Sequence, residues 1–117
     1  MSMSIYALST GPGMSGIAII RVSGKETSNV IKLLTNSSLP KPRVASLRKI
    51  NKINTSELID EAIILWFPGP ESYTGEDMAE IHIHGSKAVV DALHTSISKI
   101  KNCRLAEPGE FTKLAFQ

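Results

Sequence analysis

Two charged residues inside apolar, strand-like segments are the first candidates for ligand chemistry. Arg21 follows the β-branched run at residues 17–20, and Glu80 lies between Ala79 and Ile81. A carboxylate in a core-forming strand needs a partner, since burying an unpaired charge is costly. Two interpretations remain open. Glu80 forms a structural ion pair, with Arg21 as the candidate partner, or it accepts the N–H edge of a ligand. Arg21 either binds a ligand or lies at a sheet edge in water.

Two histidines follow Glu80 at strand spacing. His82 and His84 share a face with Glu80, because side chains alternate along a strand. The three could begin a two-histidine, one-carboxylate metal site, which would make the protein a metal-dependent hydrolase. Three positions in line on a straight strand do not converge on one ion. A polar face that lines a pocket or contacts solvent is therefore the favoured interpretation.

A glycine-rich segment at residues 11–16 has the G-x-G-x-x-G spacing of dinucleotide-binding loops. That fingerprint needs a helix at its third glycine, whereas Gly16 here opens a β-branched run. We therefore predict a tight turn between two strands, whose glycines still allow a ligand to approach closely. No Gly-Lys-Ser/Thr follows, so the segment is not a P-loop for GTP.

A basic stretch at residues 41–52 could meet phosphates. It has no aromatic residue for base stacking, and edge-strand lysines that prevent aggregation are the commoner explanation. The basic residues of the stretch are Lys41, Arg43, Arg48, Lys49 and Lys52.

Cys103 is the single cysteine, which excludes a disulfide framework, and it is predicted to be a small buried residue.

Composition and length are those of one globular domain. The chain has 117 residues, 42% of them hydrophobic and 21% charged, which excludes disorder of the whole chain. Its net charge, 13 − 11 = +2, does not support nucleic-acid binding on electrostatics alone. No apolar run approaches the ~20 residues that span a bilayer, and no secretory signal begins the chain. We expect a cytoplasmic protein.

The elements that position the candidate residues follow from periodicity and from Gly and Pro punctuation. The order predicts an α+β (mixed α/β) domain, with one mixed sheet and helices packed on it. The apolar run at 62–67 predicts a strand buried on both faces, and Ser23 with Glu26 predicts a capping box. Strands are expected at 5–9, 17–22, 43–52, 59–67, 78–84 and 103–106, and helices at about 26–34, 86–100 and from Pro108, the last pattern still running at Gln117.

Five segments together resemble the N-terminal domain of the tRNA-modification GTPase MnmE, also called TrmE. The most specific is WFPGPESYTGED at residues 66–77. The order and spacing of the segments match that family over nearly the whole chain. The others are STGPG with GIAIIRVSG at 9–24, LPKPR at 39–43, EIHIHG at 80–85 and RLAEPGEFTK at 104–113.

The resemblance implies a single N-terminal domain over residues 1–117, similar to the tetrahydrofolate-binding domains of one-carbon enzymes. It would form a homodimer and bind 5-formyl- or 5,10-methylene-tetrahydrofolate near the dimer interface. The resemblance places folate contacts at Arg21 and Glu80, with a third at a lysine a few residues beyond the Ala-Phe segment at 115–116, past this sequence.

For the full protein, the resemblance implies GTP hydrolysis in a separate domain that binds GTP, Mg and K. Together with the flavin protein MnmG, it would install a carboxymethylaminomethyl-type group at carbon 5 of the wobble uridine of tRNA. A helical domain would also lie outside this chain. The 117 residues alone would then be inactive.

This sequence departs from the family pattern at several positions. Gly11 replaces a usual proline, Met14 and Ser15 replace a basic residue and a glycine, and Leu114 replaces an arginine. Ser86-Lys87 also replaces a usual Gly-Pro. The changes in the loop would remove any contact that the usual basic residue makes. With them, the shape of the pocket no longer follows from the family pattern. The alternative function is a dimerisation module that does not bind folate.

Overall fold

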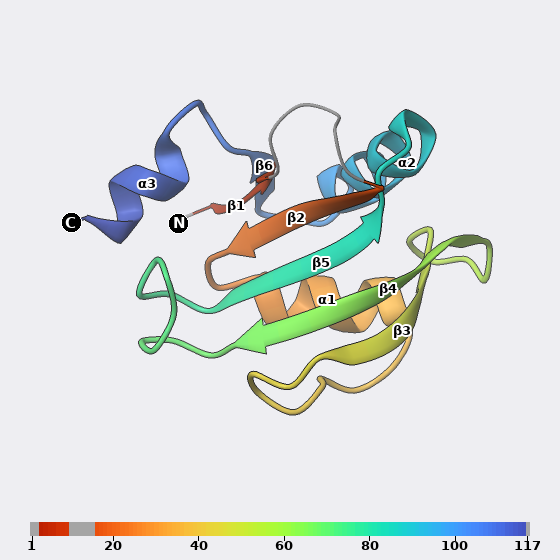
Figure 1. Ribbon diagram of the computed structural model, residues 1–117, viewed down its shortest axis with the longest axis horizontal. Coiled ribbons are helices and arrows are strands. Elements are labelled where there is room, and N and C mark those ends of the chain that lie inside the picture. Colours follow the sequence, from red (N-terminus) through yellow and green to blue (C-terminus); the bar gives the residue numbers. More distant parts are fainter. Residues whose placement is uncertain (1–2, 10–15, 117) are drawn as a thin grey trace.

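The computed structural model describes residues 3–9 and 16–116, in which strands and helices follow the predicted order (Figure 1). The elements are β1 (Ser4–Leu8), β2 (Ile17–Ser23), α1 (Thr27–Thr35), β3 (Ser46–Asn51), β4 (Leu58–Phe67), β5 (Met78–His84), α2 (Lys87–Ser98), β6 (Cys103–Leu105) and α3 (Glu110–Ala115).

The strands form one mixed sheet in the order β3-β4-β5-β2-β1-β6. β6 runs parallel to β1, and the other neighbours are antiparallel. Helix α1 packs behind the sheet against β3 and β5, and α2 packs against β4, β5 and β6 (Figure 1). The predicted α+β class, with one mixed sheet and helices packed on it, is confirmed.

The core lies between the sheet and these two helices. Ile20, Ile81 and Ile64 stand opposite one another on β2, β5 and β4, and all three are fully buried. Leu34 of α1 and Leu93 of α2 are fully buried against them. Truncating such a side chain to alanine typically lowers the free energy of unfolding by about 2–5 kcal/mol, so this row contributes strongly to the stability of the sheet.

The predicted capping box is wrong. Ser23 is the last residue of β2, and α1 begins at Thr27 without a side-chain cap from Glu26. The Glu26 backbone N–H instead donates to the Ser4 hydroxyl at 2.8 Å. Gly24 makes this approach possible, because it has φ +127° and a Cβ there would lie 2.4 Å from Ser4 Oγ. The cap comes from a distant strand, which local spacing does not reveal.

The expectation that residues 62–67 are buried on both faces is also wrong. Ala62, Ile64 and Trp66 are buried toward the helices, whereas Ile63 is 39% exposed. Both longer helices, α1 and α2, pack on the same side of the sheet, and neither covers the other side. We call this second side the open face. It carries a row of opposed residues, Leu47, Ile63, His82 and Ile19.

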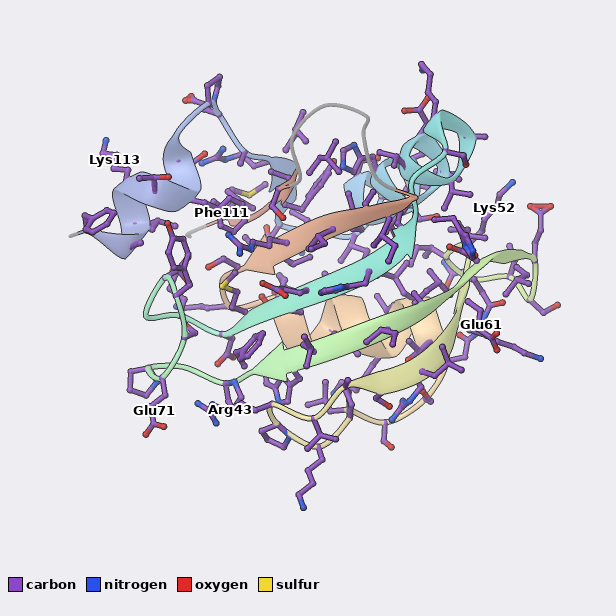
Figure 2. The ribbon with its side chains drawn as sticks, viewed as in Figure 1. Arg43, Lys52, Glu61, Glu71, Phe111 and Lys113 are labelled. Atoms are coloured by element: carbon purple, nitrogen blue, oxygen red, sulfur yellow. The ribbon has the colours of Figure 1, made fainter. Side chains whose placement is uncertain are left out.

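The basic stretch does not gather into one patch. Arg43 donates to Glu71 and Lys52 pairs with Glu57, and Figure 2 places Arg43 and Lys52 far apart. Arg48 and Lys49 lie on β3, an edge strand, as the aggregation-blocking interpretation requires.

Cys103 is buried, as predicted, and its thiol pKa is raised to about 11 by burial and by Glu26.

None of the helices in residues 3–9 and 16–116 is long and apolar enough to cross a membrane.

A half-buried histidine of α2, His94, should make stability depend on pH. The Nε2 atom of His94 is buried and has no hydrogen-bond partner among the described residues. The ring centroids of His94 and Tyr6 are 5.5 Å apart. Burial lowers the pKa of His94, and Asp91 offsets only part of that shift. The stability that neutral His94 provides is therefore complete above its unfolded pKa of about 6.5 and is lost as the pH falls toward the folded-state value.

We expect the free energy of unfolding, measured by urea titration, to fall less between pH 7.5 and pH 5.5 in His94→Leu than in the wild-type chain. Leucine has no ionisable group, and it has no side-chain nitrogen that would be buried without a partner. Equal losses in the two proteins would show that His94 does not contribute to the acid sensitivity.

Candidate ligand site on the open face

The sheet brings Arg21 and Glu80 together. The two are direct cross-strand partners on β2 and β5, and Arg21 Nε lies 3.2 Å from Glu80 Oε2. Their side chains are 31% and 17% exposed, so the pair is shielded but open to a ligand. The ion pair considered from the sequence is confirmed as a contact. A role for either residue in ligand binding stays a prediction.

The second oxygen of Glu80 also has a partner. His82 Nε2 lies 3.1 Å from Glu80 Oε1, on the same face of β5. Each carboxylate oxygen therefore has one neighbour that can donate to it. An ionised carboxylate offers about four acceptor positions, so Glu80 keeps the capacity to receive further N–H groups.

Tyr73 is a site residue that sequence reasoning missed. Its ring lies over the guanidinium of Arg21, with Cζ 5.2 Å from the ring centroid, and the residue is 48% exposed. A cation held over an aromatic face is attracted by the ring quadrupole. The only signal in the sequence is that Tyr73 belongs to the segment at 66–77 that carries the family resemblance.

The loop that carries Tyr73 is anchored to β2. The Ser23 and Thr74 hydroxyls are hydrogen-bonded at 2.7 Å, and Ser23 also donates to Glu76 Oε1 at 2.9 Å. At the start of the loop, a Cβ on Gly69 would lie only 2.8 Å from the Glu76 carbonyl carbon, so glycine is required there. This network holds the aromatic ring in place over the arginine.

A pocket of about 350 Å³ lies beside Arg21, between the end of β1 and residues 106–112. Arg21 lines it, together with Leu8, Ser9, Glu107 and Phe111, whereas Glu80 does not. Figure 2 places Phe111 on the side of α3 toward the sheet and Lys113 on its far side. The pocket therefore opens next to one member of the charged pair only.

One wall of this pocket is fixed by a two-pronged ion pair. Arg104 donates from Nη1 and Nη2 to the two oxygens of Glu110, at 2.8 Å and 2.5 Å. These bonds, with one from the Glu107 backbone, hold the pKa of Glu110 below its usual range. Because bidentate arginine–carboxylate pairs have a defined geometry, the start of α3 is held against β6.

The histidines that could begin a metal site bind different carboxylates. Asp60 accepts from the His84 backbone N–H at 2.8 Å and lies 2.9 Å from His84 Nδ1, whereas His82, two residues earlier on β5, contacts Glu80. Burial favours a raised pKa for Asp60, but the bonds from His84 hold it lower than usual. Residues 3–9 and 16–116 contain no group of three or more side chains that could hold a metal ion.

Most of the glycine-rich segment lies outside the described residues, including the departures at Gly11, Met14 and Ser15. Gly16 is described, and its carbonyl accepts from Gly85 N–H at 2.9 Å. The residues that follow it form strand β2, as predicted, and not the helix that a dinucleotide-binding loop requires.

Comparison with known proteins identifies the family. The family model described as the N-terminus of the GTP-binding protein TrmE matches residues 4–117. The chain belongs to this family. The identification made from sequence segments is thereby confirmed, and these segments include the residues that surround the Arg21–Glu80 pair.

Several curated proteins resemble this TrmE N-terminal chain over almost its whole length. The tRNA modification GTPase MnmE of Pelagibacter ubique is 86% identical over 115 residues, covering 98% of this chain and 26% of that protein. The mitochondrial tRNA modification GTPase mss1 of Schizosaccharomyces pombe is 51% identical, covering 97% and 23%. The mitochondrial 5-taurinomethyluridine-tRNA synthase subunit GTPB3 of Homo sapiens is 46% identical, again covering 97% and 23%. The chain spans about a quarter of the length of these relatives.

The anchor of the Tyr73 loop can be tested by Ser23→Ala. This change removes the hydrogen bonds of the Ser23 hydroxyl to Thr74 and Glu76, and losing a buried hydrogen bond typically costs about 1–3 kcal/mol. We expect a loss of that size in the free energy of unfolding by chemical denaturation. Ser56→Ala, at an exposed loop position, should change it by less than about 0.5 kcal/mol. Equal stability of the two variants would contradict the anchoring role.

Proposed function

We propose that this chain is the tetrahydrofolate-binding and homodimerising domain of a tRNA-modification GTPase. The proposal is supported by the family and by the names of relatives, which are tRNA modification GTPases. In the whole protein, GTP with Mg and K would bind in another domain. With MnmG, that protein would modify carbon 5 of the wobble uridine of tRNA in the cytoplasm.

The observation that carries folate binding is the Arg21–Glu80 pair on the open face, beside the pocket of about 350 Å³. The pterin ring of a folate presents a carbonyl next to ring N–H and amino groups. Such an edge needs one donor and one acceptor, which a guanidinium and a carboxylate supply. The residues present therefore fit 5-formyl- or 5,10-methylene-tetrahydrofolate, and the bound folate would supply the one-carbon unit.

In this site Glu80 would accept N–H groups and Arg21 would donate to an oxygen. Glu80 is well suited to this role because Arg21 and His82 already fix both of its oxygens, so little ordering remains to be done on binding. The alternative is a dimerisation module without a folate site. Because Arg21 and Glu80 already neutralise each other, neither residue requires a ligand, and this supports the alternative.

The open face is the surface we assign to the second copy of the chain. Leu47 and Ile63 are 62% and 39% exposed there, in neighbouring strands. Lys49 stands opposite Glu61 in the adjacent row, so both charges occur on one surface. A two-fold interface requires a patch that complements itself, and an apolar row beside mixed charges meets that requirement.

Folate binding is tested by calorimetric titration with 5-formyltetrahydrofolate. We expect saturable binding by the wild-type chain and a rise in Kd of about 10- to 100-fold in Glu80→Gln and Arg21→Ala, because each loses a charge-assisted hydrogen bond worth about 1.5–3 kcal/mol. Glu57→Gln, which removes an exposed carboxylate of another ion pair, serves as the matched control.

Wild-type affinity in both site variants would contradict the assigned roles. Absence of binding, also in a chain extended past residue 117 to the lysine that the resemblance implies, would leave the dimerisation module as the function of this domain.

Dimerisation is tested by sedimentation analysis of Ile63→Glu at micromolar concentration. A carboxylate in the middle of the apolar row would be buried without a partner in the dimer, so we expect a monomer, against a dimer for wild type. Lys32→Glu introduces the same side chain on α1, behind the sheet, and should remain dimeric. A dimer in Ile63→Glu would place the interface elsewhere.

A further inference from the structure

The guanidinium of Arg21 has a side that the ion pair does not use. Only Nε is bonded to Glu80, and neither terminal nitrogen is hydrogen-bonded within the part of the chain that the structure describes. Arg21 also lines the pocket of about 350 Å³, and Glu80 does not. The unused N–H groups of Arg21 are therefore the donors available to a molecule in that pocket.

Tyr73 and Glu80 together determine how this guanidinium is oriented. The Glu80 carboxylate fixes Nε at 3.2 Å, and the Tyr73 ring covers the planar group with Cζ 5.2 Å from its centroid. An edge contact and a face contact on one planar group leave little rotational freedom. Since the Tyr73 loop is itself bonded to Ser23, the arginine is held before a ligand arrives.

The walls of the pocket favour a neutral acceptor over an anionic one. Two carboxylates line it with Arg21, and Glu110 is neutralised by Arg104, so Glu107 is the acidic lining group without an ion pair among the described residues. A ligand carboxylate would be repelled by Glu107, which has no ion-pair partner among the described residues. A planar ring with a carbonyl would instead pack against the apolar side chains of Leu8 and Phe111 and accept from Arg21.

We propose that this pocket is the carbonyl subsite of the ligand site, and that Tyr73 is the positioning residue that holds Arg21 toward it. The inference rests on the proposed folate function and deepens it. It assigns the terminal nitrogens of Arg21 to the neutral lactam carbonyl of the pterin, and not to the carboxylates of the glutamyl tail. Tyr73 acts through Arg21 and is not itself a contact of the ligand.

Two fragments of the folate distinguish the two acceptors. We would titrate the chain with 6-methyltetrahydropterin, which carries the ring carbonyl, and with p-aminobenzoyl-L-glutamate, which carries the carboxylates. We expect Tyr73→Leu to weaken the pterin fragment about tenfold and to leave the glutamate fragment unchanged, with Tyr73→Phe restoring most of the affinity because it keeps the ring. If only the glutamate fragment responds to Tyr73→Leu and Arg21→Ala, the carbonyl assignment is overturned.

A double-mutant cycle tests whether Tyr73 acts through Arg21. In an Arg21→Ala background, Tyr73→Leu should cause no further loss of 5-formyltetrahydrofolate affinity, since there is no guanidinium left to orient. Losses that add in full would mean that Tyr73 contacts the ligand directly, which overturns the positioning role. Thermal unfolding of each variant provides the readout for a general loss of structure.

Failure of this inference can be told apart from failure of the folate function. Wild-type binding of 5-formyltetrahydrofolate with an unchanged Kd in Tyr73→Leu would overturn the inference and leave the folate site standing. Absence of wild-type binding to the folate and to both fragments would overturn the proposed function, and this inference with it.

Discussion

The register between β2 and β5 is the constraint on which the rest of the molecule depends. It sets Ile20 against Ile81 on the helix side and Arg21 against Glu80 on the open face. Since side chains alternate with a period of two, a slip of either strand by one residue would turn its isoleucine outward and its charged residue into the core. The same pairing that builds the core therefore builds the candidate site, and neither can shift without the other.

Much of this could be predicted from the sequence because the relevant signals are local. Alternation in residues 78–84 separated the buried side chains from Glu80, His82 and His84, and the order of strands and helices followed from apolar runs and Gly-Pro punctuation. A partner for Glu80 was predicted from the cost of burying a carboxylate, and Arg21 is that partner.

The features that the sequence did not reveal depend on contacts between distant segments. Ser23 matched a local capping pattern, but β2 extends through it, and its hydroxyl binds a loop some fifty residues away. The apolar run at 62–67 could not show that both helices choose the same side of the sheet. Tyr73 sits in a polar loop without periodicity, so only the fold places its ring on Arg21.

The polar side chains of β5 form two separate histidine–carboxylate contacts. Along β5, His82 is joined to Glu80 and thereby to the arginine, while His84 is joined to Asp60 at the other end. Each histidine has its own carboxylate, so the polar row divides into two independent clusters. The cluster that contains Glu80 adjoins the pocket of about 350 Å³, through Arg21.

Trp66 gives the chain a built-in optical reporter. It is the single tryptophan, it is only 7% exposed, and it lies near the end of β4, just before the loop that carries Tyr73. Its indole faces the helix layer and not the open face of the sheet. Fluorescence from this residue therefore reports on the integrity of the interior, and an emission change on adding a compound would signify a disturbance transmitted through the strand.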